Sequence, residues 1–80
     1  MLTSEFVEFI KAGRIDRVTI YRPSAESAWS VYAYGEELPA ATVNHLVLNT
    51  QGSKRLWSDL TAAHHFIRKS GYTQNIEIDG

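Results

Sequence analysis

The spacing of apolar residues near the start of the chain predicts an amphipathic helix. Thr3 or Ser4 can cap its amino end, and Gly13 can end it in a left-handed conformation. We therefore expect a helix over residues 3–12. Its apolar stripe, at the spacing of one helical face, consists of Leu2, Phe6, Phe9 and Ile10.

The period then changes from that of a helix to that of a strand. Val18 and Ile20 point one way and alternate with Arg17, Thr19 and Tyr21, which indicates a first strand. Polar residues and a proline at 23–27 interrupt it, and a second alternating run follows at 28–34. The two runs are expected to pair as a hairpin. In the second run, one face carries Trp29, Val31 and Ala33, and the other carries Ser30, Tyr32 and Tyr34.

Two further strands are expected in the middle of the chain. Residues 35–41 read as a loop because they hold glycine, two glutamates and a proline. An apolar run then predicts a third strand at 44–50. After a turn at 51–53, residues 54–57 are expected to fold back as a fourth strand with Leu56 inward.

The last third of the chain predicts a helix and a closing strand. Ser58 is the expected cap of a helix over residues 59–70, and Gly71 is the expected stop. Ile76 and Ile78 then alternate with polar residues, which indicates a strand. The apolar stripe of the helix consists of Leu60, Ala63, Phe66 and Ile67.

These elements predict a single α+β domain over residues 1–80, in the order α-β-β-β-(β)-α-β. We expect a two-layer sandwich, with an antiparallel sheet of four to five strands and two helices on one face. Helices this short are marginal alone, so both must bury their stripes on the same side of the sheet. The other face would stay open, and Tyr21, Tyr32, Tyr34 and Val47 are candidates to line it.

Composition fits a small globular protein. Of 80 residues, 44% are hydrophobic and 21% charged, which is far from the signature of disorder. Eight basic and nine acidic residues give a formal net charge of −1, so no global field favours nucleic acid or a membrane. The absence of cysteine excludes disulfides and thiolate chemistry, and no apolar run approaches a membrane span. We expect a cytoplasmic protein that does not contact the membrane.

No pattern in the sequence points to catalysis, a cofactor or a metal. His64 and His65 are neighbours on a predicted helix and diverge by about 100°, so with His45 they make a poor ligand set. Glu36 and Glu37 are adjacent in a predicted loop, which suits a solvated segment better than an acid–base pair. No serine lies in a nucleophile elbow. We expect a protein that is not an enzyme and that binds neither a cofactor nor a metal.

Nucleic-acid binding is the alternative function. The order helix, three strands, helix is that of double-stranded RNA-binding domains, but the second predicted helix here lacks the lysine-rich start of that family. A local basic patch beside this helix is the candidate contact with phosphate. It consists of Lys54, Arg55, Arg68 and Lys69.

Aromatic residues give the preferred candidate site. Tyr32 and Tyr34 share one face of the second strand, and Tyr21 lies across the strand pair. Tyrosines are common in strands for packing reasons, yet an exposed row of them would offer a contact for a protein partner. A homodimer formed through this face is one way to cover it.

Three segments of the chain carry a family resemblance: AGRIDRVTIYR at 12–22, WSVYAYG at 29–35, and the tail that runs from LWSDL at 56–60 to IEIDG at 76–80. With these segments, the chain as a whole resembles the small plasmid-encoded ParC-type partition-associated proteins. The resemblance implies a mobile-element context, an accessory role in plasmid maintenance and no known enzymatic activity, and it assigns no functional residue. The segment Glu36 to Thr42 departs most from the family pattern.

The sequence as a whole favours a non-catalytic binding or regulatory accessory protein that acts through protein contacts. An inhibitor of a host system is one form that such a protein could take, since mobile elements encode compact inhibitors of host defence. Nothing in the chain identifies the partner.

Overall fold

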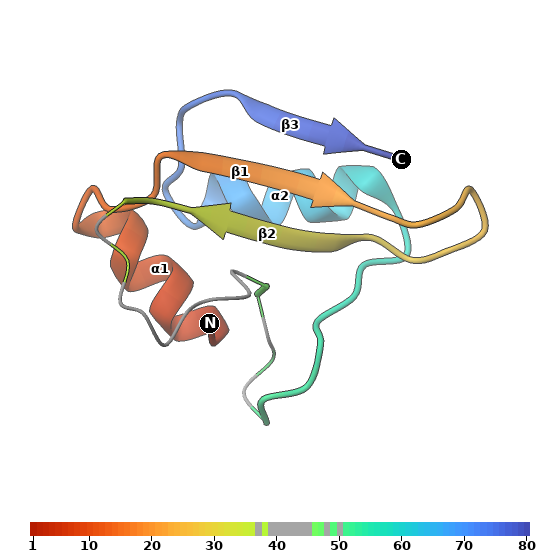
Figure 1. Ribbon diagram of the computed structural model, residues 1–80, viewed down its shortest axis with the longest axis horizontal. Helices are drawn as coiled ribbons and strands as arrows, with labels where there is room; N and C mark the ends of the chain where they lie inside the picture. Colours follow the sequence, from red (N-terminus) through yellow and green to blue (C-terminus); the bar gives the residue numbers. More distant parts are fainter. Residues whose placement is uncertain (37, 39–45, 48, 50) are drawn as a thin grey trace.

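The computed structural model describes residues 1–36, 38, 46–47, 49 and 51–80. Within them the chain forms a small α+β fold with two helices and a three-stranded mixed sheet (Figure 1). The elements are α1 (Thr3–Lys11), β1 (Arg17–Tyr21), β2 (Ser30–Tyr34), α2 (Leu60–Lys69) and β3 (Ile76–Asp79).

The strands lie in the order β2-β1-β3, so β1 is central. β1 and β2 form the expected antiparallel hairpin, with Val18 opposite Ala33. β3 pairs parallel to β1, with Ile76 beside Val18. The prediction of an all-antiparallel sheet of four to five strands is therefore wrong for the described residues. The physical reason is that α2 runs back behind the sheet, so the chain enters β3 from the same end as β1 (Figure 1).

The third strand was predicted at 44–50, where residues 44, 45, 48 and 50 lie outside the described residues. Leu46 forms an isolated antiparallel bridge with Tyr32. The amide of Val47 donates to the Val31 carbonyl oxygen, at an N···O distance of 2.9 Å. Leu46 and Val47 therefore lie along the edge of β2 that does not pair with β1.

After the turn the chain folds back as predicted, since the amides of Asn49 and Arg55 donate to the carbonyl oxygens of Ser53 and Val47. Residues 54–57 nevertheless form no regular strand, and Leu56 does not point inward. Its side chain is 54% exposed, whereas Trp57 is buried. Trp57 forms an isolated bridge with Trp29, at the start of the hairpin's second arm. The large indole takes the inward position because burying it removes more apolar area from water than burying leucine would.

One core joins both helices to one face of the sheet. The inward side chains of β1 and β2, Val18, Ile20, Val31 and Ala33, are fully buried, as the alternation predicts. Phe6 of α1 stacks on Phe66 of α2, with ring centroids 5.5 Å apart. Val47 is fully buried in the same core, so it does not line the opposite face.

The helix caps differ from the predicted ones. Leu2, and neither Thr3 nor Ser4, occupies the cap position of α1, where its amide donates to Glu5 Oε1 at 2.8 Å. Asp59, and not Ser58, caps α2, and its carboxylate accepts from the Ala62 amide at 2.7 Å. A charged acceptor at this position also complements the positive end of the helix dipole.

Candidate functional site

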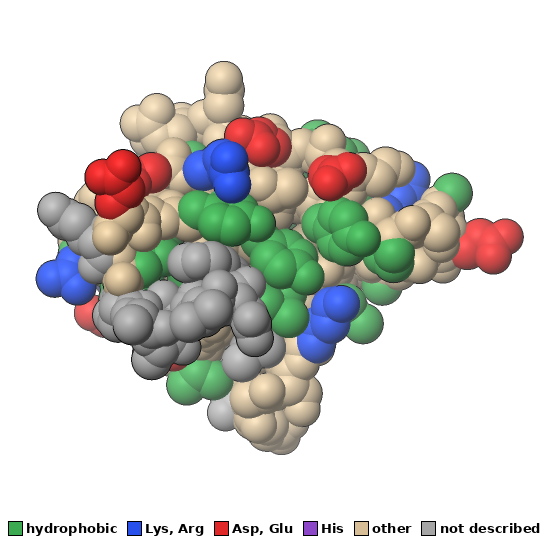
Figure 2. Space-filling view, viewed as in Figure 1, with side chains coloured by type: hydrophobic (Ala, Val, Ile, Leu, Met, Phe, Trp, Pro, Cys, Tyr) green, Lys and Arg blue, Asp and Glu red, His purple; other side chains and the backbone are tan. Residues whose placement is uncertain are grey.

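The face of the sheet opposite the helices carries the three tyrosines singled out from the sequence. Strand register sets them in rows, because Thr19 of β1 lies between Tyr32 of β2 and Glu77 of β3. The next row holds Tyr21 beside Asp79. Figure 2 shows this face, where hydrophobic side chains gather over β1 and β2 and charged side chains follow the neighbouring rim.

A shallow hollow of about 300 Å³ opens on this face. The three tyrosines that line it, Tyr21, Tyr32 and Tyr34, are half-buried, which leaves part of each ring accessible. The structure thus brings together all three predicted tyrosines and adds two residues that the sequence argument missed. The lining consists of Thr19, Tyr21, Tyr32, Tyr34 and Asp79.

The aromatic rings hold one another in fixed orientations. Tyr21 and Tyr32 meet edge to face, with centroids 6.0 Å apart and an interplanar angle of 85°. This is one of the preferred arrangements of an aromatic pair. Tyr34 is covered by the guanidinium of Arg17, whose central carbon lies 4.3 Å from the ring centroid.

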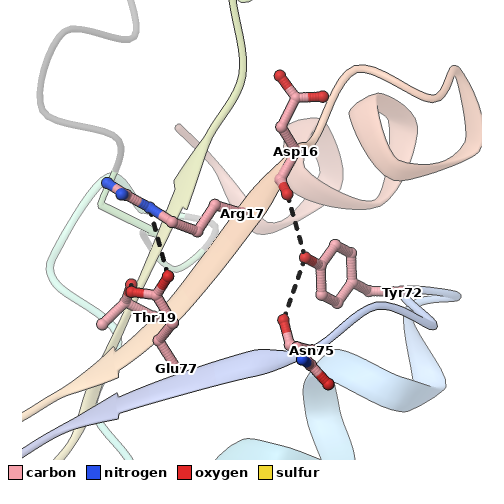
Figure 3. Close-up of polar contacts among 6 residues, drawn as sticks. All are labelled: Asp16, Arg17, Thr19, Tyr72, Asn75 and Glu77. Atoms are coloured by element: carbon pink, nitrogen blue, oxygen red, sulfur yellow. Dashed lines mark hydrogen bonds and ion pairs between the residues drawn. The ribbon is translucent and has the colours of Figure 1, made fainter.

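Polar contacts tie β3 to β1 beside the hollow (Figure 3). The Arg17 Nε lies 4.0 Å from Glu77 Oε1, and both side chains are exposed. The Thr19 hydroxyl donates to Glu77 Oε2 at 3.5 Å. Solvent screens such surface contacts strongly, so they orient Arg17 and Glu77 more than they stabilise the fold.

Tyr72 is a buried residue that the sequence argument did not single out. Its hydroxyl lies 3.3 Å from the Asn75 carbonyl oxygen and 3.5 Å from that of Asp16, so it joins the segment after α2 to the start of β1 (Figure 3). Burial raises the pKa of this hydroxyl, the guanidinium of Arg68 lowers it, and the carboxylate of Asp16 raises it. A tyrosine that follows a helix-ending glycine gave no periodic signal that could have marked it.

Two of the four residues in the predicted basic patch are engaged within the protein. Arg55 lies over the rings of Trp57 and Phe66, at 5.0 and 4.7 Å from their centroids. Arg68 donates to the carbonyl oxygens of Tyr72 and Gln74, at 3.0 and 2.6 Å. Lys54 and Lys69 are exposed.

The histidines do not assemble a site among the described residues. His64 is half-buried on α2 and His65 is exposed, while His45 lies outside the described part of the chain. Neither His64 nor His65 lines any of the four main hollows. Within the described residues, no group of three histidine or acidic side chains is placed to hold a metal ion.

Comparison of the chain with protein-family models, curated proteins and solved structures found no match. In the described part of the chain, neither helix combines the length and the apolar character needed to cross a bilayer.

Proposed function

We propose that this domain is a non-catalytic binding module that contacts a protein partner through the helix-free face of its sheet. The observation that carries the proposal is the hollow in which Tyr21, Tyr32 and Tyr34 converge. Tyrosine is enriched at protein interfaces because its ring buries a large apolar area while its hydroxyl stays compatible with water.

The scaffold supports this use of the face. Below the tyrosines, Val18, Ile20 and Val31 are fully buried, so the strands that carry the rings are anchored in the core. Side chains on such strands lose little further freedom on binding, which lowers the entropic cost of association. The face therefore suits docking of a preformed surface.

A protein partner fits this face better than nucleic acid does. Among the described residues, Asp79 is the only charged residue that lines the hollow, and a carboxylate repels phosphate. The guanidinium groups of Arg55 and Arg68 are occupied by contacts within the chain. An accessory role in the maintenance of a plasmid or another mobile element, implied by the sequence resemblance, is part of the proposal.

Capture of partners from a bacterial host, run both with and without nuclease, tests the proposal. Wild-type protein is compared with Tyr32→Ala and with Thr19→Arg, which places a bulky side chain in the hollow without removing a buried contact. Leu56→Ala is the matched control, because Leu56 is 54% exposed and does not line the hollow.

We expect wild type and Leu56→Ala to capture the same protein partner whether or not nuclease is present. Tyr32→Ala and Thr19→Arg should not capture it. Circular dichroism checks that each variant is folded, and Thr19→Arg decides the outcome if Tyr32→Ala unfolds. Equal capture by all folded variants, or recovery of nucleic acid alone, would overturn the proposal.

A further inference from the structure

From the chemistry of the hollow we infer that it receives an arginine side chain presented by the protein partner. This inference rests on the proposed function and specifies the partner group that the tyrosine face recognises. It follows from three properties of the site: the accessible tyrosine rings, the carboxylate of Asp79 in the described lining, and the contacts that the nearby arginines already make within the chain.

The lining of the hollow combines aromatic rings with one carboxylate. Tyrosine faces attract cations through their ring quadrupole, and a carboxylate adds a direct charge attraction. Asp79 lies beside Tyr21 in the strand register and makes no ion pair within the described part of the chain. A site of three rings and a carboxylate is complementary to a cation and not to an anion.

Arginine is favoured over lysine by the geometry of a flat site. The guanidinium is planar, stacks on aromatic rings and sheds water more readily than an ammonium does. The chain already uses this contact next to the hollow, where Arg17 covers Tyr34 at 4.3 Å. An arginine from a partner would repeat the same packing on the accessible surfaces of Tyr21 and Tyr32.

The chain's own nearby arginines are engaged elsewhere and do not line the hollow. Arg17 is held between Tyr34 and Glu77. Arg22 lies 4.2 Å from the ring centroid of Trp29 and donates to the carbonyl oxygen of Ala25 at 3.1 Å. Among the described residues, none of these arginines pairs with the carboxylate of Asp79, which is the group that we infer meets the partner.

An NMR titration of the intact protein tests this inference with N-acetyl-arginine amide as the probe. N-acetyl-citrulline amide is the matched control ligand, since it has nearly the same shape but carries a neutral urea, in which a carbonyl oxygen replaces one NH2 group of the guanidinium. We expect the arginine probe to shift the ring signals of Tyr21 and Tyr32 in a saturable way, and the citrulline probe to bind severalfold more weakly. Equal shifts from both probes, or arginine shifts confined to other residues, would contradict it.

Protein variants separate the two attractions. Asp79→Asn should weaken arginine binding about two- to fivefold, as expected for an exposed ion pair, whereas Glu26→Gln, which removes a charge outside the hollow, should not. Tyr32→Leu should weaken it by a similar factor, and Tyr32→Phe, which keeps the ring, should not. An unchanged affinity in Asp79→Asn and Tyr32→Leu would overturn the inference.

The outcome is distinguishable from failure of the proposed function. If partner capture depends on Tyr32 but is unaffected by Asp79→Asn, the hollow binds a protein but does not recognise an arginine of that protein. If capture does not depend on the hollow at all, the proposed function itself is wrong. Reduced capture in Asp79→Asn, with capture by Glu26→Gln unchanged, supports both.

Discussion

Trp29 and Trp57 exchange two backbone hydrogen bonds, with N···O distances of 2.8 and 2.9 Å. The pair fastens the segment before α2 to the start of the hairpin's second arm. Trp57 also packs on Phe66, with ring centroids 4.9 Å apart. One irregular contact thus connects the sheet to α2 on the face opposite the tyrosines.

Replacement of this indole should destabilise the fold far more than replacement of its neighbour. Trp57→Ala removes a buried aromatic side chain and should lower the free energy of unfolding by about 3–5 kcal/mol. Leu56→Ala removes an exposed side chain and should change it by less than about 0.5 kcal/mol. Urea denaturation followed by circular dichroism measures both, and equal losses would refute the assigned burial.

The identity of the α2 cap gives a second stability prediction. Asp59→Ala removes the acceptor of the Ala62 amide and should cost about 1 kcal/mol of unfolding free energy. Ser58 lies one residue before the cap, so Ser58→Ala should lower the free energy of unfolding by at most a few tenths of the loss expected for Asp59→Ala. The reverse order of the two losses, measured by thermal or urea unfolding, would show that Ser58 caps the helix as the sequence suggested.

Tyr72 predicts how stability depends on pH. Its pKa is raised in the folded protein by burial, so the folded state holds this proton more tightly than the unfolded state does. The stabilisation is complete below the ordinary tyrosine pKa of about 10 and is lost as the pH rises above that value through the folded pKa. The Tyr72→Phe variant lacks the hydroxyl and therefore lacks this contribution to the pH dependence.

The comparison of wild type with Tyr72→Phe isolates this effect from other groups that titrate at high pH. We expect the unfolding free energy of wild type to fall more steeply than that of the variant between about pH 9.5 and 11. Urea unfolding at fixed pH values provides the measurement. Parallel pH profiles would show that the Tyr72 pKa is not raised by folding.

The alternation of apolar residues was enough to predict the hairpin and its two faces. Val18 and Ile20 point into the core while Tyr21 and Tyr32 point away from it, as the period of two requires. The helices were predicted to within a residue or two because their apolar stripes and stop signals agree. Their caps were not, since several polar residues compete for each cap position and only tertiary packing selects one.

The direction of β3 and the inward turn of Trp57 could not be predicted from local pattern. Ile76 and Ile78 specify a strand but not its neighbour, because partner choice depends on where α2 returns the chain. Residues 54–57 carry too short a pattern to fix which face is inward. Asp79 joined the hollow only through this parallel pairing with β1, so no sequence signal marked it as part of the site.

Site-specific photocrosslinking tests the central claim most directly. A benzophenone amino acid placed at Tyr32 in the hollow is compared in the host with the same group at Leu56, which is exposed but outside it. The account predicts a discrete protein adduct from position 32 and none from position 56. An adduct from position 56 with none from 32, or an adduct with nucleic acid at position 32, would contradict it.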